Sequence, residues 1–202
     1  MAEEFPIIPE KTAMLFFDTL NGSNPEGEAK LRATGYFDNL VKIEQACRAA
    51  GIAIFYTQPE HRKDGSDWGL TVIGEPPSTT YFKGVNFKGS HHAEIIDDIK
   101  PQPGDYIITK HRWSSFFQTC LELSLRTAGI DTIILAGGAT QIGIASTAYE
   151  ARDYNYSLIV LSDAIHSTPE IDEFFLTKVF PNFARVMTID ETVAKFAVPV
   201  GV

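Results

Sequence analysis

Residues 129–148 read GIDTIILAGGATQIGIASTA, and this stretch decides the fold. It carries an uninterrupted apolar run from Ile133 to Ala136, then two glycines, then small and apolar residues at helical spacing. A continuous apolar strand followed at once by a helix is typical of a parallel sheet whose strands are buried on both faces. We therefore expect a strand over residues 132–136 and a helix over residues 141–153.

The same alternation extends in both directions along the chain. Further strands are expected at 12–18, 52–57, 106–110, 157–162 and 185–189, and helices at 31–50, 117–127 and 170–179, with a short helix near the C-terminus. This order predicts an α/β fold of three Rossmann-like layers, with a mostly parallel six-stranded sheet and helices on both faces. A chain of 202 residues suits one domain over 1–202.

Residues 58–105 interrupt this rhythm. The segment is too long for an ordinary connection, is rich in Gly and Pro, and contains interleaved aromatic residues and the pair His91-His92. We expect it to be a loop or lid insertion over the site, or an oligomer contact.

Composition argues against several classes of partner. The formal net charge is −9, which disfavours nucleic acid and anionic membranes. No apolar run approaches the roughly 20 residues that cross a bilayer, and the first residues lack a secretory pattern. The only cysteines, Cys47 and Cys120, form no disulfide framework or zinc pattern. The expected location is the cytoplasm.

Polar residues follow most of the expected strands. Asp18 follows the first, Gln58 the second, Lys110 the third, residues 137–140 the fourth and Asp163 the fifth. Ligands of open α/β sheets bind outside the carboxyl ends of the strands, so these residues should meet at one edge.

Residues 110–119 read KHRWSSFFQT. Together with residues 129–148 they resemble the isochorismatase-like hydrolases. That pattern is a lysine ending a strand, Ser-x-Phe-x-x-Thr, a Gly-Ile turn into a strand, then Gly-x-x-Thr-x-x-Cys and Ser/Thr-Thr-Ala on a helix. The strand-one aspartate and the turn at Ser162-Asp163-Ala164 extend the resemblance over most of the chain outside the long loop.

The resemblance implies an Asp–Lys–Cys triad, in which Asp18 and Lys110 match and Gly143 takes the cysteine position. Glycine cannot form an acyl-enzyme, so thiol chemistry is absent there. Gly143 could be natural, an engineered change, or tolerated because a neighbouring backbone lies close. Cys120 could be a substitute nucleophile, although a free cysteine is usually a small buried hydrophobe.

True isochorismatases, as the resemblance implies, also carry glycine there. Their aspartate protonates the carbon of a vinyl ether, and water adds to the oxocarbenium ion. Asp18 would need a dry pocket to hold its proton, and Lys110 would orient substrate or stabilise negative charge. Alone, Asp18 could merely cap a turn and Lys110 could be a solvated strand end.

Substrate-binding residues are also expected from the resemblance. Gln58 resembles a glutamine that holds substrate. Gly138-Ala139 fall where relatives carry a non-proline cis peptide bond. With Thr140, such a bond would direct backbone N–H groups toward a substrate oxygen. The alternative explanation for these residues is a tight turn between a strand and a helix. Trp113 and Trp68 could line an apolar pocket, although core or subunit packing explains them equally well.

Departures from the pattern leave the substrate open. Trp68 stands where an arginine is expected, Ala139 replaces a tyrosine and Leu20 a glutamine. Nicotinamidase-like relatives bind a metal through an aspartate and histidines after strand two. Glu60-His61 and His91-His92 lack that spacing, so no metal or cofactor is expected.

The expected function is a hydrolase that acts on a small-molecule substrate without a thiol, by vinyl-ether or related water-mediated hydrolysis. One alternative is a catalytically inactive small-molecule-binding protein. Another is an amidase or ester hydrolase that activates water with Asp18 as base. The resemblance also implies a homo-oligomer, of undetermined number.

Overall fold

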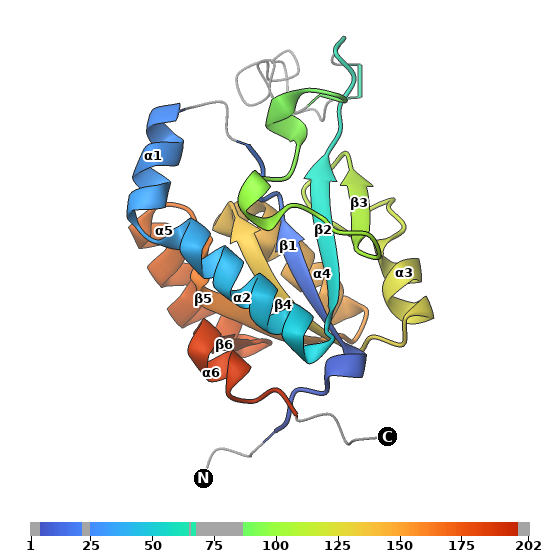
Figure 1. The fold of residues 1–202 in the computed structure, drawn as a ribbon, viewed down its shortest axis with the longest axis vertical. Coiled ribbons are helices and arrows are strands. Elements are labelled where there is room, and N and C mark those ends of the chain that lie inside the picture. Colours follow the sequence, from blue (N-terminus) through green and yellow to red (C-terminus); the bar gives the residue numbers. More distant parts are fainter. Residues whose placement is uncertain (1–4, 22–24, 65, 68–86, 198–202) are drawn as a thin grey trace.

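The computed structural model describes residues 5–21, 25–64, 66–67 and 87–197. Its sheet has six strands, all of whose pairings are parallel, in the order β3-β2-β1-β4-β5-β6 (Figure 1). The strands are β1 (Thr12–Phe17), β2 (Ala53–Pro59), β3 (Tyr106–Lys110), β4 (Thr132–Gly138), β5 (Ser157–His166) and β6 (Arg185–Met187). The predicted α/β fold with a parallel six-stranded sheet is confirmed.

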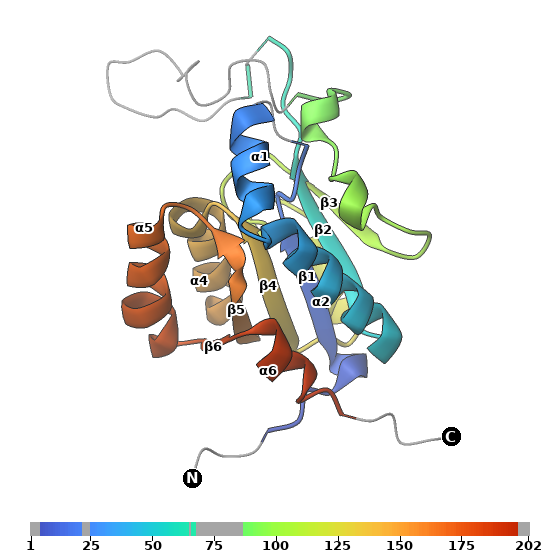
Figure 2. The same ribbon diagram turned by 60° about the vertical axis from the view of Figure 1, so that its left-hand side comes forward.

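Helices cover both faces of the sheet (Figure 2). One face carries α2 (Tyr36–Ala50) and α6 (Ile189–Val193), with α1 (Pro25–Ala33) packed against α2; the other carries α3 (Leu121–Thr127), α4 (Ala145–Asp153) and α5 (Pro169–Phe174). Along β1, Met14 and Phe16 point into the first layer, whereas Leu15 and Phe17 point into the second. Burial of each such side chain contributes about 1.5–3 kcal/mol, which explains the continuous apolar runs.

Two predicted helices have different boundaries. The helix expected over 31–50 is divided at Gly35, whose φ of 80° is left-handed, so α1 and α2 are separate. The helix expected from residue 117 begins only at Leu121. Before it, the Ser114 hydroxyl accepts the Phe116 N–H (3.1 Å) and the Thr119 hydroxyl accepts the Leu121 N–H (3.1 Å). The Ser-x-Phe-x-x-Thr motif therefore shapes a loop.

Three strands run further than predicted, and one of them is β4, which continues to Gly138. β2 continues to Pro59, so Gln58 lies within it, and β5 continues to His166, so Asp163 lies within it. The Asp163 carboxylate accepts the Ile189 N–H (3.0 and 3.2 Å) at the start of α6. Asp163 therefore fixes α6 to the sheet, and its expected place at the site stays a prediction.

Part of the long segment 58–105 belongs to the core. Ile95, Ile96 and Ile99 are buried, and the Ile96 N–H donates to the Thr19 carbonyl (3.0 Å). Leu20 forms an antiparallel bridge with Ile95. Residues 68–86, including Trp68, lie outside the described residues, so a lid over the site stays a prediction.

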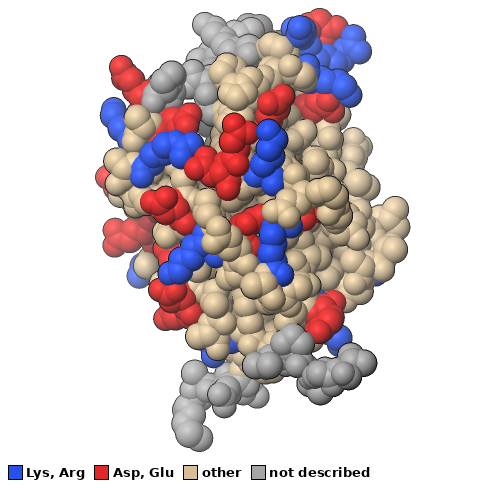
Figure 3. Space-filling model, in the orientation of Figure 1, with Lys and Arg blue, Asp and Glu red and all other residues tan. Residues whose placement is uncertain are grey.

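The surface is mixed in charge. On the face shown in Figure 3, Lys and Arg side chains lie among Asp and Glu side chains. Among the helices that the structure describes, none has both the length and the apolar character required to span a bilayer.

Candidate active site

Asp18 and Lys110 meet at the carboxyl edge of the sheet. Asp18 directly follows β1 with a left-handed φ of 46°, and its N–H donates to the Thr57 carbonyl on β2 (3.1 Å). Lys110 is the last residue of β3. Although β2 separates these strands, Lys110 Nζ lies 2.7 Å from Asp18 Oδ2. The two side chains are only 6% and 18% exposed, so the pair is largely shielded from water.

The two oxygens of Asp18 differ in their surroundings. Oδ2 contacts the Lys110 ammonium, whereas Oδ1 is buried and accepts no hydrogen bond from the residues that the structure describes. Burial raises the pKa of Asp18, and the nearby positive charge of Lys110 opposes that rise without cancelling it. Of the two oxygens, Oδ1 is therefore the one that the Lys110 ammonium does not hold.

Lys110 is held in place by three contacts. Besides Asp18, its ammonium donates to the Arg112 carbonyl (3.3 Å) and lies 4.5 Å from the centroid of the Phe17 ring. These contacts fix a long, flexible side chain in one orientation, so its charge is directed at the carboxyl group.

The Phe17 ring also closes the space around Gly143. Gly143 lies in η4 (Thr140–Ile144), a single turn of π-helix that precedes α4. A Cβ atom at Gly143 would lie 2.1 Å from both Cε1 and Cζ of Phe17. The close neighbour is thus a side chain, not the backbone that the sequence suggested. A side chain of any kind at position 143, a cysteine included, requires the Phe17 ring to move.

Close approaches also explain the glycine pair before this turn. Gly137 has a φ of 125°, and a Cβ there would lie 2.0 Å from the Phe17 carbonyl oxygen. A Cβ at Gly138 would lie 2.4 Å from Nε2 of His166. The Gly138–Ala139 peptide bond is cis.

The polar groups of η4 are largely used within the turn. The N–H groups of Ile142, Gly143 and Ile144 all reach the Ala139 carbonyl, at 3.2, 3.1 and 3.3 Å. The Thr140 hydroxyl donates to Asp172 Oδ1 (2.5 Å). The N–H of residue 143 and the hydroxyl of Thr140 are therefore already engaged within the protein. The binding of a substrate oxygen by backbone N–H groups at this turn stays a prediction.

The other predicted site residues differ in their exposure to solvent. Gln58 is half-buried near the end of β2, and Ala139 is half-buried between β4 and η4. Trp113 is 61% exposed, so its side chain lies largely in solvent. Cys120 is exposed at the start of α3, and Cys47 is buried in α2, where burial raises the pKa of its thiol.

A chain of three buried hydroxyls, which reaches Asp18 through Thr57, was not predicted. The Ser115 N–H donates to the Thr147 hydroxyl (3.0 Å), and the Ser115 hydroxyl donates to the Thr57 hydroxyl (3.3 Å). Thr57 pairs with Phe17 in the sheet, next to Asp18. The available signal was a threonine at the end of the apolar run of β2.

His61, Asp67 and His111 form a cluster that could hold a metal ion. One ligand atom from each lies within 4.8 Å of the others. His61 follows β2 and His111 follows β3, so the sheet joins them although 50 positions separate them in the sequence. Spacing within the loop after β2 gave no sign of this cluster, because one of its three residues comes from a different strand end.

Known proteins resemble the chain over nearly its whole length. A family model described as the isochorismatase domain matches residues 12–191. An uncharacterized isochorismatase family protein of Bacillus subtilis (strain 168), YwoC, is 44% identical over 186 residues, which cover 90% of this chain and 92% of that protein. The ureidoacrylate amidohydrolase RutB of Rhizobium rhizogenes (strain K84 / ATCC BAA-868) is 30% identical, over 81% of this chain and 74% of that protein.

The fold has a solved counterpart as well. The crystal structure of a cysteine hydrolase from Pseudomonas syringae pv. phaseolicola 1448A superposes with a TM-score of 0.81 at 26% identity. The match covers 96% of this chain and 98% of that one.

Proposed function

The chain belongs to the isochorismatase family of hydrolases, and from this premise we propose that it hydrolyses a small molecule without a cysteine nucleophile. The observation that carries the proposal is the Phe17 ring, which fills the space of a side chain at position 143 beside an intact Asp18–Lys110 pair. The acid–base pair is present, and the place for a thiol is occupied by an aromatic ring.

The reaction that suits this pair best is vinyl-ether hydrolysis of the isochorismate type. Asp18 donates the proton on Oδ1 to the terminal carbon of the C=C–O group, which leaves an oxocarbenium ion. Water adds to that ion, returns a proton to Asp18, and the resulting hemiketal breaks its C–O bond to give a carbonyl compound and an alcohol. No covalent bond to the enzyme is formed.

Lys110 has a defined part in this sequence. Burial raises the pKa of Asp18, which favours the protonated form that a general acid requires. Once the proton has left, the carboxylate lies 2.7 Å from an ammonium group, so the charge that develops in the transition state is stabilised. The same contact holds Oδ2, which directs Oδ1 away from Lys110.

A second candidate is an amidase or ester hydrolase in which ionised Asp18 activates water. The close Lys110 contact favours the ionised carboxylate, and the similarity to an amidohydrolase supports an amide substrate. The raised pKa of Asp18 favours the first candidate, because a general acid must hold its proton.

Substrate turnover after thiol alkylation tests the proposal. The purified protein is assayed with vinyl-ether carboxylates and with ureido and simple amides, before and after iodoacetamide treatment. We expect turnover of a vinyl ether that survives alkylation and is lost in Asp18→Asn. The matched control is Asp38→Asn, an exposed carboxyl on α2, which should remain fully active.

Each other outcome has a definite meaning. Turnover of amides alone would favour the activated-water candidate. Inactivation by iodoacetamide, together with loss of turnover in Cys120→Ser, would make Cys120 the nucleophile and overturn the proposal. Thermal stabilisation by small acids without any turnover would identify a catalytically inactive binding protein.

A further inference from the structure

His166 ends β5 at the same edge of the sheet as Asp18. Phe17, the residue before Asp18, pairs with Gly137 on β4. The next residue of β4, Gly138, pairs with His166. Asp18, Gly138 and His166 therefore lie in one row across the three adjacent strands β1, β4 and β5 (Figure 1). Neighbouring strands are ~4.8 Å apart, so the backbones of Asp18 and His166 are separated by about two strand spacings.

The imidazole of His166 extends over Gly138, on the strand next to β1. A Cβ atom at Gly138 would lie 2.4 Å from Nε2 and 2.7 Å from Cδ2 of this ring. The ring thus takes the place that a side chain at position 138 would occupy, immediately before the cis peptide bond. In the plane of the sheet, Nε2 is therefore only about one strand spacing, ~4.8 Å, from the backbone of Asp18.

Two neighbours hold the imidazole in this direction. The ring of Tyr36, the first residue of α2, packs against it edge to face, with centroids 4.7 Å apart. The Asp172 carboxylate on α5 accepts the N–H of Ser167 (2.8 Å), the residue after His166, and also the Thr140 hydroxyl of η4 (2.5 Å). One carboxylate therefore joins the end of β5 to the turn that follows the cis peptide bond.

The ring nitrogens of His166 have no hydrogen-bond partner among the residues that the structure describes. Burial lowers the pKa of His166, and the negative charge of Asp172 opposes this change. The neutral imidazole has one donor nitrogen and one acceptor nitrogen, and buried polar groups are normally paired. Because the ring is only half-buried, a small molecule at the sheet edge can reach it.

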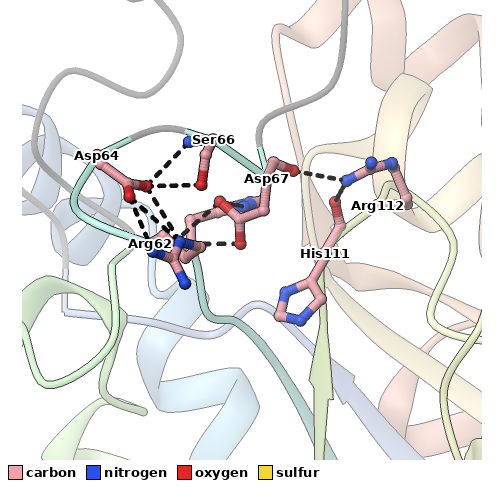
Figure 4. A network of polar contacts seen from close by, with 7 residues as sticks. Arg62, Asp64, Ser66, Asp67, His111 and Arg112 are labelled. Carbon is pink, nitrogen blue, oxygen red and sulfur yellow. Dashed lines mark hydrogen bonds and ion pairs between the residues drawn. The ribbon is translucent and has the colours of Figure 1, made fainter.

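The opposite flank of Asp18 is occupied by hydrogen bonds within the protein. There, Nη1 of Arg112 donates to the Asp67 carbonyl (2.9 Å) and to the His111 carbonyl (2.6 Å), which connects the end of β3 to the loop after β2 (Figure 4). The β5 flank, in contrast, presents an imidazole whose nitrogens lack a partner among the described residues. A substrate held at Asp18 therefore finds a polar partner on the side of β5.

We propose that His166 is a substrate-binding residue, whose imidazole forms a hydrogen bond with a hydroxyl group of the substrate away from the reacting carbon. A hydroxyl group both donates and accepts, so it suits either nitrogen of the ring. The proposal rests on the function proposed above, which places the reacting carbon at Asp18. Because the hydroxyl group does not react, its bond forms equally in the ground state and the transition state, so its loss raises KM and leaves kcat unchanged.

Matched substrates isolate this hydrogen bond. Vinyl-ether carboxylates with a hydroxyl group at successive carbons are each compared with the analogue in which hydrogen replaces the hydroxyl group. One hydrogen bond is worth about 2- to 10-fold in affinity, so the unaltered protein should prefer one hydroxylated compound by that factor in KM. His166→Phe keeps a ring but removes both nitrogens, and it should lose the preference at constant kcat. His166→Gln keeps a donor and an acceptor and should retain part of it.

Binding is also measured without turnover, in an Asp18→Asn background. The chain has five histidines, so its NMR spectrum contains five Cε1–Hε1 signals, and the one that disappears in His166→Phe belongs to His166. We expect the preferred hydroxylated compound to shift this signal and to bind about 2- to 10-fold more tightly than its analogue.

His91→Ala is the matched control, because His91 is an exposed histidine of η2 (His91–Ala93), and it should keep the full preference. Far-UV circular dichroism checks that each variant is folded, and His166→Ala replaces His166→Phe if the latter does not fold. An undiminished preference in His166→Phe would overturn the proposal, and so would bound compounds that leave the His166 signal in place.

Failure of the proposed reaction gives a different result. Compounds that bind and shift the His166 signal, but that the unaltered protein does not turn over, would refute the vinyl-ether chemistry and leave His166 as a ligand-binding residue. Absence of binding by every compound would overturn both proposals.

Discussion

The contact between Gly143 and the Phe17 ring predicts that Gly143→Ala destabilises the protein when the ring is present and stabilises it when the ring is removed. Glycine in a helical turn is normally about 0.5–1 kcal/mol less stable than alanine, so propensity alone favours the substitution. The new Cβ, however, would lie 2.1 Å from two ring carbons, where ordinary contact begins at 3.4 Å. The ring must retreat by more than an ångström.

The surroundings of the Phe17 ring leave little room for this movement. Phe17 is 2% exposed within the core, and the Lys110 ammonium lies 4.5 Å from its ring centroid. Overpacking of a full core costs about 1–3 kcal/mol, which exceeds the gain in helix propensity. We therefore expect Gly143→Ala to destabilise the protein by about 1–2 kcal/mol, a fall in Tm of roughly 2–4 °C per kcal/mol for a chain of this size.

The same substitution should be favourable once the ring is gone. Phe17→Ala alone should cost about 3–5 kcal/mol through the cavity it leaves. In that background, Gly143→Ala removes no contact and should stabilise by about 0.5–1 kcal/mol, so the coupling between the two sites is about 2 kcal/mol.

Urea unfolding of the four proteins, followed by circular dichroism, measures this cycle. If Phe17→Ala does not fold, Phe17→Leu gives a smaller coupling of the same sign. Additive free energies of unfolding would refute the reasoning, because they would show that the ring and residue 143 do not compete for space. The same clash predicts that Gly143→Cys alone gains no amidase activity.

Three further predictions concern charge and capping. If protonated Asp18 is the acid, kcat/KM falls as pH rises through the pKa of Asp18. Lys110→Met removes the positive charge that lowers this pKa, so the falling limb of the pH profile should move to higher pH. A shift of that limb to lower pH would contradict the assignment. Arg48→Met should cost about 3–5 kcal/mol in urea unfolding, because Arg48 pairs with the buried Asp105 carboxylate (2.6 Å), and a loss below about 1 kcal/mol would show that this pair behaves like a surface ion pair. Thr188→Ala should lower Tm through loss of about 1 kcal/mol, since its hydroxyl accepts the Glu191 N–H (3.2 Å) at the start of α6; an unchanged Tm would show that this capping box is not needed.

Much of the fold could be predicted from the chain alone. Continuous apolar runs such as residues 132–136 are specific to strands buried on both faces, so sheet type and layer order followed from local pattern. Element ends were less predictable. Gly35 stops a helix whose apolar spacing continues past it, and β5 passes through Asp163 because the later α6 supplies a partner for that carboxylate.

The sequence by itself determined that Asp18 directly follows one strand of the sheet and that Lys110 ends another. Parallel strands bring their carboxyl ends to one edge, so the strand pattern was enough to place Asp18 and Lys110 together. Only the tertiary structure decided what surrounds them. The Phe17 ring beside Gly143, and the meeting of His61, Asp67 and His111, depend on side-chain directions and on contacts between segments far apart in the chain. Periodicity specifies the face on which a side chain lies, but not which distant atoms share its space.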